Sequence, residues 1–265
     1  MVTGASSGIG AAFARALAAR GYDLALVARR QDRLKQLADE ISKAHGAGCT
    51  VLAADLTNDA ELRKVEDFLA GAANLALLVN NAGFGALGRF FEAPVESADA
   101  MHRLHVLATM RLTHAALGNL VARGDGAVVN VSSVAAFVPR PGSTSYYATK
   151  AWINCFTECI HLELKSAGSR VRVQALCPGF TLTEFHDVLG VDRKTILSGA
   201  WWMAADDVVA ASLQGLDEGK LFVVPGLRYK LLVGLLRMLP RGLVHYAVAK
   251  GPTGLRSDRR PAKST

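Results

Sequence analysis

Cysteine pairs and long apolar runs are missing from this sequence. Its four cysteines form no Cys-x-x-Cys pair and have no histidine at metal-ligand spacing. This pattern argues against disulfides and a zinc site, so we expect no bound metal. No stretch of 18 apolar residues and no signal peptide is present. We therefore expect a soluble, cytoplasmic protein.

Acidic residues become scarce after residue 227. From Arg228 to Thr265 the sequence holds nine Lys/Arg and one acid, whereas the first 227 residues hold 21 basic and 22 acidic side chains. The net charge of +7 therefore describes the C-terminal part of the chain. No nucleic-acid module and no interleaved aromatic residues accompany this charge, so we expect no nucleic-acid partner.

Short apolar runs alternate with amphipathic stretches in a chain that is 51% hydrophobic. This alternation predicts one α/β domain with a Rossmann-like, doubly wound parallel sheet. Strands are expected at 23–28, 50–53, 75–79, 127–131, 171–176 and 221–224. Helices are expected at roughly 9–20, 31–45, 58–70, 97–122 and 146–167.

Three segments follow from this pattern: a catalytic domain over 1–226, a basic amphipathic segment over 227–250, and a disordered tail over 251–265. Only Met1, Val2 and Thr3 precede the first glycine, which is short for a buried strand. Either the first strand is short, or the sequence begins downstream of its natural start. We favour the second explanation, a truncated first strand.

A glycine-rich turn follows this first strand. Glycines allow a tight turn and a close approach to a pyrophosphate, and the next helix offers its N-terminal N–H groups. The spacing G-x-x-x-G-x-G differs from the common fingerprint G-x-G-x-x-G. The turn predicts a dinucleotide site, with the candidate residues Thr3, Gly4, Ser6, Ser7, Gly8, Ile9 and Gly10.

The ends of the next strands add to this site. Arg29 and Arg30 stand where an acidic residue would bind the ribose of NAD, and two guanidinium groups suit a 2′-phosphate. NADP is therefore favoured over NAD. Asp55 and Leu56 are placed to meet the adenine, although Asp55 is equally suited to capping the next helix. Small residues at 81–83 let the backbone approach the cofactor.

Tyr146 lies four residues before Lys150, and Ser133 lies thirteen residues before Tyr146. Residues four apart share a helix face, where an ammonium group lowers the pKa of a phenol from its usual value of about 10. Such a phenol exchanges protons near neutral pH, which carbonyl and alcohol chemistry requires. Ser133 would hold the same substrate oxygen. Taken alone, a helical surface pair explains Tyr146 and Lys150 equally well.

Together these motifs resemble the short-chain dehydrogenase/reductase family over roughly residues 1–226. The matching motifs are Thr3-Gly4-x-x-x-Gly8-x-Gly10, Asp55, Asn80-Asn81-Ala82-Gly83, Ser133, Tyr146-x-x-x-Lys150 and Pro178-Gly179. The resemblance implies that Tyr146 is the general acid and base. It also implies that Lys150 binds the nicotinamide ribose and lowers the phenol pKa, while Ser133 orients the substrate oxygen. The family spacing selects these over the neighbouring Ser132 and Tyr147.

The resemblance also implies contacts to the cofactor and an assembly. Asn81, Ala82 and Gly83 would line the adenosine side, and Pro178, Gly179 and Thr181 would meet the nicotinamide carboxamide. A homo-oligomer, dimer or tetramer, is expected. His105 departs from the family, which often has an asparagine there that holds a water linked to the lysine. His105 is either a catalytic proton relay or a buried histidine with satisfied ring nitrogens.

Apolar residues surround the expected substrate side, including the segment 180–203, which is the variable substrate loop in the family. They indicate a lipophilic substrate, or else they pack a lid or a subunit contact. Residues 228–250 form a basic amphipathic pattern broken at Pro240. Such a pattern suits peripheral contact with an anionic membrane, and equally packing on the body or on another subunit, which we favour.

The leading hypothesis is an NADP-dependent oxidoreductase that transfers a hydride between NADPH and a ketone or aldehyde, or in reverse from an alcohol. One alternative is a cofactor-binding regulatory or structural protein with little turnover, against which the intact Ser133, Tyr146 and Lys150 argue. The other is an epimerase or dehydratase of the same family, which the compact length disfavours.

Overall fold

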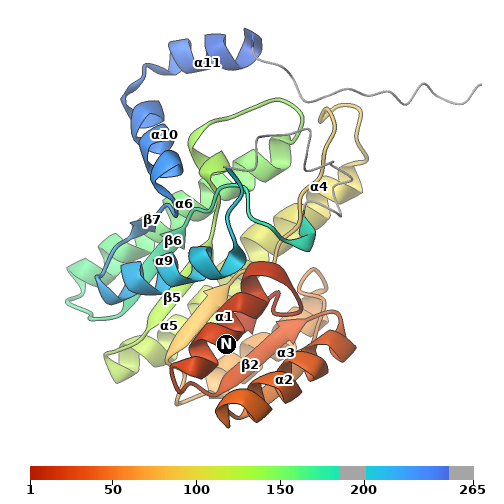
Figure 1. The fold of residues 1–265 in the computed structure, drawn as a ribbon, viewed down its shortest axis with the longest axis vertical. Helices are drawn as coiled ribbons and strands as arrows, with labels where there is room; N and C mark the ends of the chain where they lie inside the picture. The colour runs from red at the N-terminus through yellow and green to blue at the C-terminus, as the bar shows by residue number, and fades with distance from the viewer. Residues whose placement is uncertain (186–200, 251–265) are drawn as a thin grey trace, which may run out of the picture.

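A parallel seven-stranded sheet forms the centre of the computed structural model, which describes residues 1–185 and 201–250 (Figure 1). The strands lie in the order β3-β2-β1-β4-β5-β6-β7, and every neighbouring pair is parallel. The predicted α/β, doubly wound, Rossmann-like fold is therefore confirmed. The strands are β1 (Val2–Thr3), β2 (Leu24–Ala28), β3 (Cys49–Ala53), β4 (Leu77–Asn80), β5 (Ala127–Val131), β6 (Arg172–Leu176) and β7 (Phe222–Val223).

Helices connect the strands and cover both faces of the sheet (Figure 1). The α-helices are α1 (Gly8–Ala19), α2 (Gln31–His45), α3 (Asp59–Gly71), α4 (Val95–His102), α5 (Thr109–Arg123), α6 (Thr144–Ser166), α9 (Ala205–Asp217), α10 (Leu227–Met238) and α11 (Arg241–Lys250). The shorter turns are η1 (Arg103–Ala108) and η2 (Val134–Phe137). Within the described ranges, no helix combines the length and the apolar character needed to cross a membrane. The tail predicted over 251–265 lies outside the described residues.

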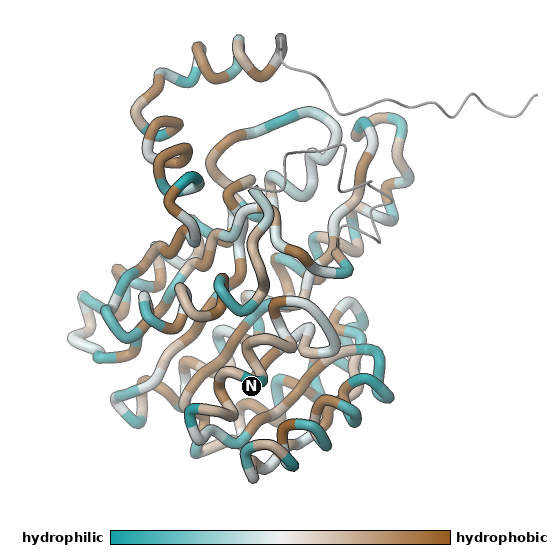
Figure 2. The backbone as a smooth tube through the Cα atoms, viewed as in Figure 1, coloured by the Kyte–Doolittle hydropathy of each residue, from teal (hydrophilic) through white to brown (hydrophobic). Residues whose placement is uncertain are grey.

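Two hydrophobic layers hold the helices against the sheet, because successive strand residues point to opposite faces. In β4, Val79 packs with α1, α2 and α9, whereas Leu78 packs with α3, α5 and α6. In β5, Val129 packs in the same layer as Val79, and Val128 packs in the same layer as Leu78. Figure 2 shows the resulting run of hydrophobic positions along the central strands. Strands buried on both faces explain why the sequence shows continuous apolar runs there.

The long helix predicted over 97–122 is interrupted in the structure. It runs as α4, then one π-helical turn over η1, then α5. A π-helical turn inserts an extra residue per turn and often marks a functional site. Here the turn contains His105, whose ring is buried beneath the end of β4. The periodicity of the sequence could not show this interruption, because one turn of π-helix barely changes the apolar pattern.

A chain of buried polar side chains ties α5 and α6 to the centre of the sheet. Asn80 Nδ2 donates to Thr113 Oγ1 at 3.0 Å and to Asn130 Oδ1 at 2.9 Å. Asn130 Nδ2 in turn donates to Thr157 Oγ1 at 3.0 Å. Because unpaired buried polar groups are costly, this chain specifies how the two helices sit on β4 and β5.

Asn130→Leu should therefore destabilise the fold, because it leaves Asn80 and Thr157 short of a partner. We expect the free energy of unfolding in urea to fall by about 2 kcal/mol. The comparison variant is Asn58→Ala, which removes the side-chain cap of α3 and should cost about 1 kcal/mol. An Asn130→Leu protein as stable as the wild type would show that the buried chain contributes nothing.

Candidate active site

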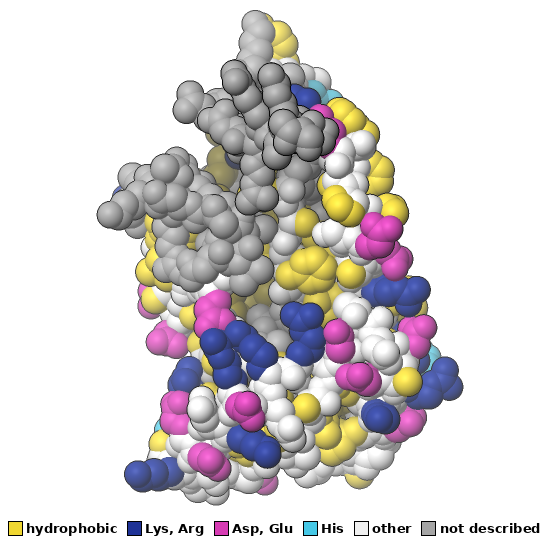
Figure 3. Space-filling view, turned by 90° about the vertical axis from the view of Figure 1, so that its right-hand side faces the viewer, with side chains coloured by type: hydrophobic (Ala, Val, Ile, Leu, Met, Phe, Trp, Pro, Cys, Tyr) yellow, Lys and Arg dark blue, Asp and Glu magenta, His cyan; other side chains and the backbone are white. Residues whose placement is uncertain are grey.

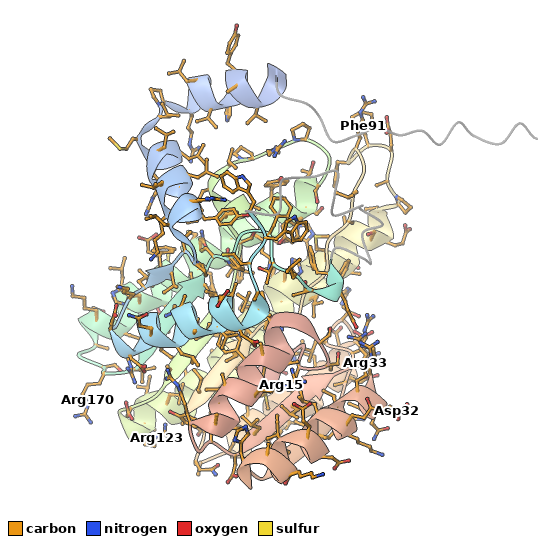
Figure 4. All side chains as sticks on the ribbon, viewed as in Figure 1. Arg15, Asp32, Arg33, Phe91, Arg123 and Arg170 are labelled. Carbon is orange, nitrogen blue, oxygen red and sulfur yellow. The ribbon has the colours of Figure 1, made fainter. Side chains whose placement is uncertain are left out.

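A cleft of about 840 Å³ lies over the carboxyl ends of the strands. The crossovers run in opposite directions from β1 and β4, which are neighbours in the sheet, so the loops that follow them diverge and leave a crevice. Figure 4 places Arg33 on the right-hand side of the molecule. Figure 3 views the molecule from that side and shows basic side chains gathered below an apolar hollow. The cleft thus has a basic end and an apolar end.

Most of the predicted cofactor residues line this cleft. They are Gly4, Ser6, Ser7, Gly8, Ile9, Arg29, Arg30, Asp55, Leu56, Asn81, Ala82, Gly83, Lys150, Pro178, Gly179 and Thr181. Thr3 and Gly10 lie beneath it instead. Thr3 Oγ1 accepts from the backbone N–H groups of Asn81 and Ala82, both at 3.0 Å. A Cβ on Gly10 would lie 2.3 Å from the carbonyl oxygen of Gly4, so glycine is required there for close packing.

The three predicted catalytic residues Ser133, Tyr146 and Lys150 come together at the other end of the cleft. Tyr146 and Lys150 lie one turn apart on α6, and Ser133, two residues after β5, lies close enough to the Tyr146 hydroxyl to lower the pKa of the phenol. Ser132 points away and donates to the carbonyl of Lys150 at 2.9 Å. The structure therefore brings Ser133, and not Ser132, to the phenol.

The pKa of Tyr146 moves opposite to the sequence-based prediction. Burial of the phenol raises its pKa to about 12, and this effect outweighs that of the nearby Ser133 hydroxyl, which lowers the pKa. The prediction relied on Lys150, but its Nζ lies 5.7 Å from the ring centroid and donates to the carbonyl of Val131 at 2.8 Å. Desolvation thus determines the protonation state, and the phenol is neutral around pH 7.

Lys150 is also desolvated, with 5% of its surface exposed. Burial lowers the pKa of its ammonium group from 10.5 to about 8. Its bond to Val131 points the group from α6 toward the end of β5. A buried amine with a pKa near neutrality is sensitive to any charge that enters the cleft.

His105 is fully enclosed and does not line the cleft. Its Nε2 accepts from the N–H of Phe84 at 3.1 Å, so its Nδ1 carries the proton and donates to Thr149 Oγ1 at 2.9 Å. Burial, and then the charge of Lys150, hold its pKa well below 6.5. This geometry matches the buried histidine with satisfied nitrogens and leaves neither nitrogen free for a relay. A Cβ on Gly83 would lie 2.8 Å from Nε2, which explains the glycine.

At the basic end, Arg30 contacts the glycine-rich turn. Its guanidinium group donates to Ser6 Oγ at 3.0 Å and to Ser7 Oγ at 2.8 Å. It also pairs with Glu184 at 2.9 Å, and Glu184 forms a second ion pair with Arg33. The paired arginines hold the pKa of Glu184 below its usual value of 4.5.

Arg29 and Asp55 lie beside this group. The side chain of Arg29 is 75% exposed, and its guanidinium group is 3.9 Å from Asp55 Oδ2. Asp55 Oδ1 accepts from the N–H and the hydroxyl of Thr57. The cap of α3 itself is Asn58, whose side chain accepts from two N–H groups. The helix cap that the sequence offered as the alternative role for Asp55 therefore belongs to Asn58.

The sequence interpretation missed several residues of the cleft. Thr183 lies against Gly8, where a Cβ would meet it at 2.9 Å. The hydroxyl of Tyr229, on α10, accepts from the N–H of Phe180 at 3.0 Å and donates to the carbonyl of Trp201 at 2.8 Å. The sequence predicted a separate segment over 227–250 and favoured its packing on the body or on another subunit. In the structure, α10 from this segment supplies part of the cleft wall. Residues 186–200 of the predicted substrate loop lie outside the described residues.

The sequence comparison decides the family. A model described as short chain dehydrogenase matches residues 1–193. The chain belongs to the short-chain dehydrogenase/reductase family. It is 35% identical over 192 residues to the very-long-chain 3-oxoacyl-CoA reductase of Bos taurus, a match that covers 71% of this chain and 61% of that enzyme. The chain thus spans less than two thirds of this relative.

Solved structures of short-chain dehydrogenases/reductases share the fold over the whole chain. A short-chain dehydrogenase from Sphingobium yanoikuyae in complex with NADPH is 36% identical, with a TM-score of 0.81 and coverage of 100% of this chain and 97% of that one. A bulky-bulky ketone specific alcohol dehydrogenase from Comamonas testosteroni is 32% identical, with a TM-score of 0.76 and coverage of 100% and 95%.

The neutral state of His105 predicts a pH-dependent stability. An unfolded histidine gains a proton below pH 6.5, whereas folded His105 does not, so its contribution is fully present above pH 6.5 and is lost as the pH falls. We expect His105→Asn to reduce the slope of unfolding free energy between pH 6.5 and 5 by about 1.4 kcal/mol per pH unit. Urea titrations measure the slope, with His45→Asn on α2 as the control. An unchanged slope would show that folded His105 takes up a proton.

Proposed function

We propose that the protein is an NADPH-dependent oxidoreductase that interconverts a lipophilic ketone or aldehyde and its alcohol. The observation that carries this proposal is the meeting of Ser133, Tyr146 and Lys150 at one end of a cleft whose other end holds Arg30. The cleft therefore offers a proton donor at one end and an anion site at the other.

The residues of the cleft fit a dinucleotide. Gly4 and Gly8 have φ values of 66° and 55°, so the turn between β1 and α1 adopts a backbone that other residues avoid. Ser7, at the start of α1, makes no side-chain cap. The first N–H groups of α1 thus remain available for a pyrophosphate, which the helix dipole also favours.

The proposed roles of the catalytic residues follow from their charges. When bound, NADPH supplies the hydride that reduces the carbonyl carbon. Tyr146, kept protonated by its high pKa, donates its proton to the carbonyl oxygen. Ser133 donates a hydrogen bond to the same oxygen and stabilises its developing negative charge. The positive charge of Lys150, close to the ring, favours the phenolate that remains after the transfer.

This electrostatic arrangement favours reduction near neutral pH. Reduction requires a loaded proton donor, which a phenol with a pKa of about 12 provides. Oxidation requires the phenolate, which is rare at pH 7 in this environment. Alcohol oxidation by the same residues should therefore need a higher pH, or a positive charge that a bound oxidised cofactor adds beside Tyr146.

A preference for NADPH over NADH rests on the basic end of the cleft. Arg30 faces Ser6 and Ser7, so a 2′-phosphate there would meet a guanidinium group and two hydroxyls. Arg29 and Arg33 lie beside Arg30. The carboxylate of Glu184 pairs with Arg30 and Arg33, where the phosphate would bind. The NADPH complex of the Sphingobium yanoikuyae enzyme supports this assignment by similarity.

The apolar end of the cleft supports a lipophilic substrate. Side chains from several separate parts of the chain meet there: Phe84, Leu87, Val138, Phe185, Trp201, Leu232 and Leu236. Ser133 and Tyr146 line the same cleft, as expected for a site that binds an apolar molecule and orients one oxygen. The relatives named for very-long-chain 3-oxoacyl-CoA and bulky-bulky ketone substrates agree with this substrate class.

Tyr146→Phe should lower turnover with NADPH and an apolar ketone by about 10² to 10⁴-fold, because it removes the proton donor. NADPH binding, measured by fluorescence titration, should stay within about twofold because the phenol is not needed to hold the cofactor. Tyr147→Phe is the matched control, since Tyr147 is the adjacent phenol on α6 and the family spacing selects Tyr146 over it. Turnover that survives Tyr146→Phe would contradict the assigned role. Binding by the wild type without turnover on any carbonyl would favour the regulatory alternative.

Arg30 and Glu184 should affect cofactor choice in opposite directions. Arg30→Ala should weaken NADPH binding by about tenfold or more, because it removes a charge-assisted contact, and should leave NADH binding nearly unchanged. Glu184→Gln should strengthen NADPH binding by about fivefold, because it frees the arginines from a competing carboxylate. Dissociation constants for both cofactors measure these effects.

The matched control is Glu40→Gln, which breaks the Arg15–Glu40 ion pair of similar exposure outside the cleft. Equal effects of Arg30→Ala on NADPH and NADH would contradict recognition of a 2′-phosphate. Weaker NADPH binding by Glu184→Gln would show that Glu184 positions the arginines rather than competing for them.

A further inference from the structure

Helix α10 has two apolar faces. One faces the body, where Tyr229 and Val233 are buried and Leu232 and Leu236 line the cleft. A helix that rests on the surface of a soluble protein normally turns polar residues outward. The opposite face of α10 is apolar as well, so packing on the body explains only half of this helix.

The outward face carries four residues that lie within one stripe of the helix, at positions i, i+4, i+8 and i+11. Their exposed fractions are 71% for Leu227, 66% for Leu231, 56% for Leu235 and 84% for Met238. Single exposed leucines are common, but a continuous stripe of large apolar side chains marks a contact surface. We call these four residues the outer stripe.

Helix α11 adds further exposed apolar side chains after Pro240. Leu243 is 58% exposed and Tyr246 is 61% exposed, and within α11 Val244 is buried. Figure 1 shows α11 standing clear of the body at the end of α10, and Figure 2 shows hydrophobic positions along both helices. Side chains of α11 project away from the body in Figure 4.

The charges beside the outer stripe have one sign. Arg228 and Lys230 lie on opposite sides of it, Arg241 begins α11, and residues 227–250 contain no Asp or Glu. A two-fold contact between copies would pair this surface with itself and bring like charges together. Apolar side chains flanked by cations match an anionic lipid surface, with acyl chains below and phosphate above.

We propose that the outer stripe and α11 dock the protein on an anionic lipid membrane. The inner face of α10 lines the cleft, so docking places the cleft beside the lipid. Resting on the proposed function, this position lets a lipophilic substrate pass from the membrane to Tyr146 without crossing water. The docking itself requires no turnover, and its test uses none.

The test is sedimentation of the full chain with vesicles of phosphatidylcholine alone or mixed with phosphatidylserine. We expect binding to the mixed vesicles at low salt, and weaker binding as salt is raised. Leu231→Glu with Leu235→Glu should abolish binding, because it places carboxylates in the stripe. Lys230→Gln with Arg241→Gln should weaken binding by about 30-fold, which corresponds to about fivefold for each lost charge.

The control is Leu162→Glu, since Leu162 on α6 is 58% exposed and lies outside this surface. It should bind vesicles like the wild type, and far-ultraviolet circular dichroism should show that every variant is folded. Three results would overturn the proposal: no wild-type binding to mixed vesicles at low salt, the same loss with Leu162→Glu, or a wild-type oligomer that the double glutamate variant dissociates. The last result would make the outer stripe a contact between copies.

Discussion

The pairing of β1 with β4 is the constraint on which the rest of the site depends. β1 has only two residues, so side chains reinforce its contact with β4. The hydroxyl of Thr3 donates to the carbonyl of Val79 and accepts from two N–H groups just beyond β4, and Asn81 Nδ2 donates back to the carbonyl of Thr3 at 3.0 Å. These bonds fix the glycine-rich turn against the end of β4. The crevice between the diverging loops, and with it the cofactor end of the cleft, exists because of this contact.

Desolvation sets the chemistry at the opposite end. Tyr146, Lys150 and His105 are three titratable groups removed from water, and each is shifted toward its neutral form. The phenol therefore holds its proton, and the histidine is a fixed hydrogen-bonding group. His105 joins the loop after β4 to Thr149 on α6, and Thr149 donates to the carbonyl of Tyr146 at 3.1 Å. The hydrogen bonds of His105 therefore fix the position of α6 relative to the loop after β4.

The sequence predicted the fold for physical reasons, and most of the site residues it proposed line one cleft. Parallel strands that are buried on both faces appear in the sequence as continuous apolar runs. Because the cleft lies at the carboxyl ends of these strands, the residues that line it come directly after the apolar runs. Side-chain partners were harder to predict. The pKa of Tyr146 was predicted with the wrong sign, because a spacing of four residues reveals proximity and says nothing of burial. Glu184 and Arg33 escaped notice because they are about 150 residues from one another in sequence and meet only in three dimensions.

The two apolar faces of α10 connect the catalytic cleft with the outside of the molecule. A helix that only closed the cleft would need the inner face, and a helix that only bound a partner would need the outer one. Tyr229 holds α10 against Gly179, where a Cβ would lie 2.1 Å from the ring, so this helix cannot move away without opening the cleft wall. Any contact on the outer stripe therefore acts on a helix that the site already depends on. In the proposed docking, substrate entry and surface contact would share one structural element.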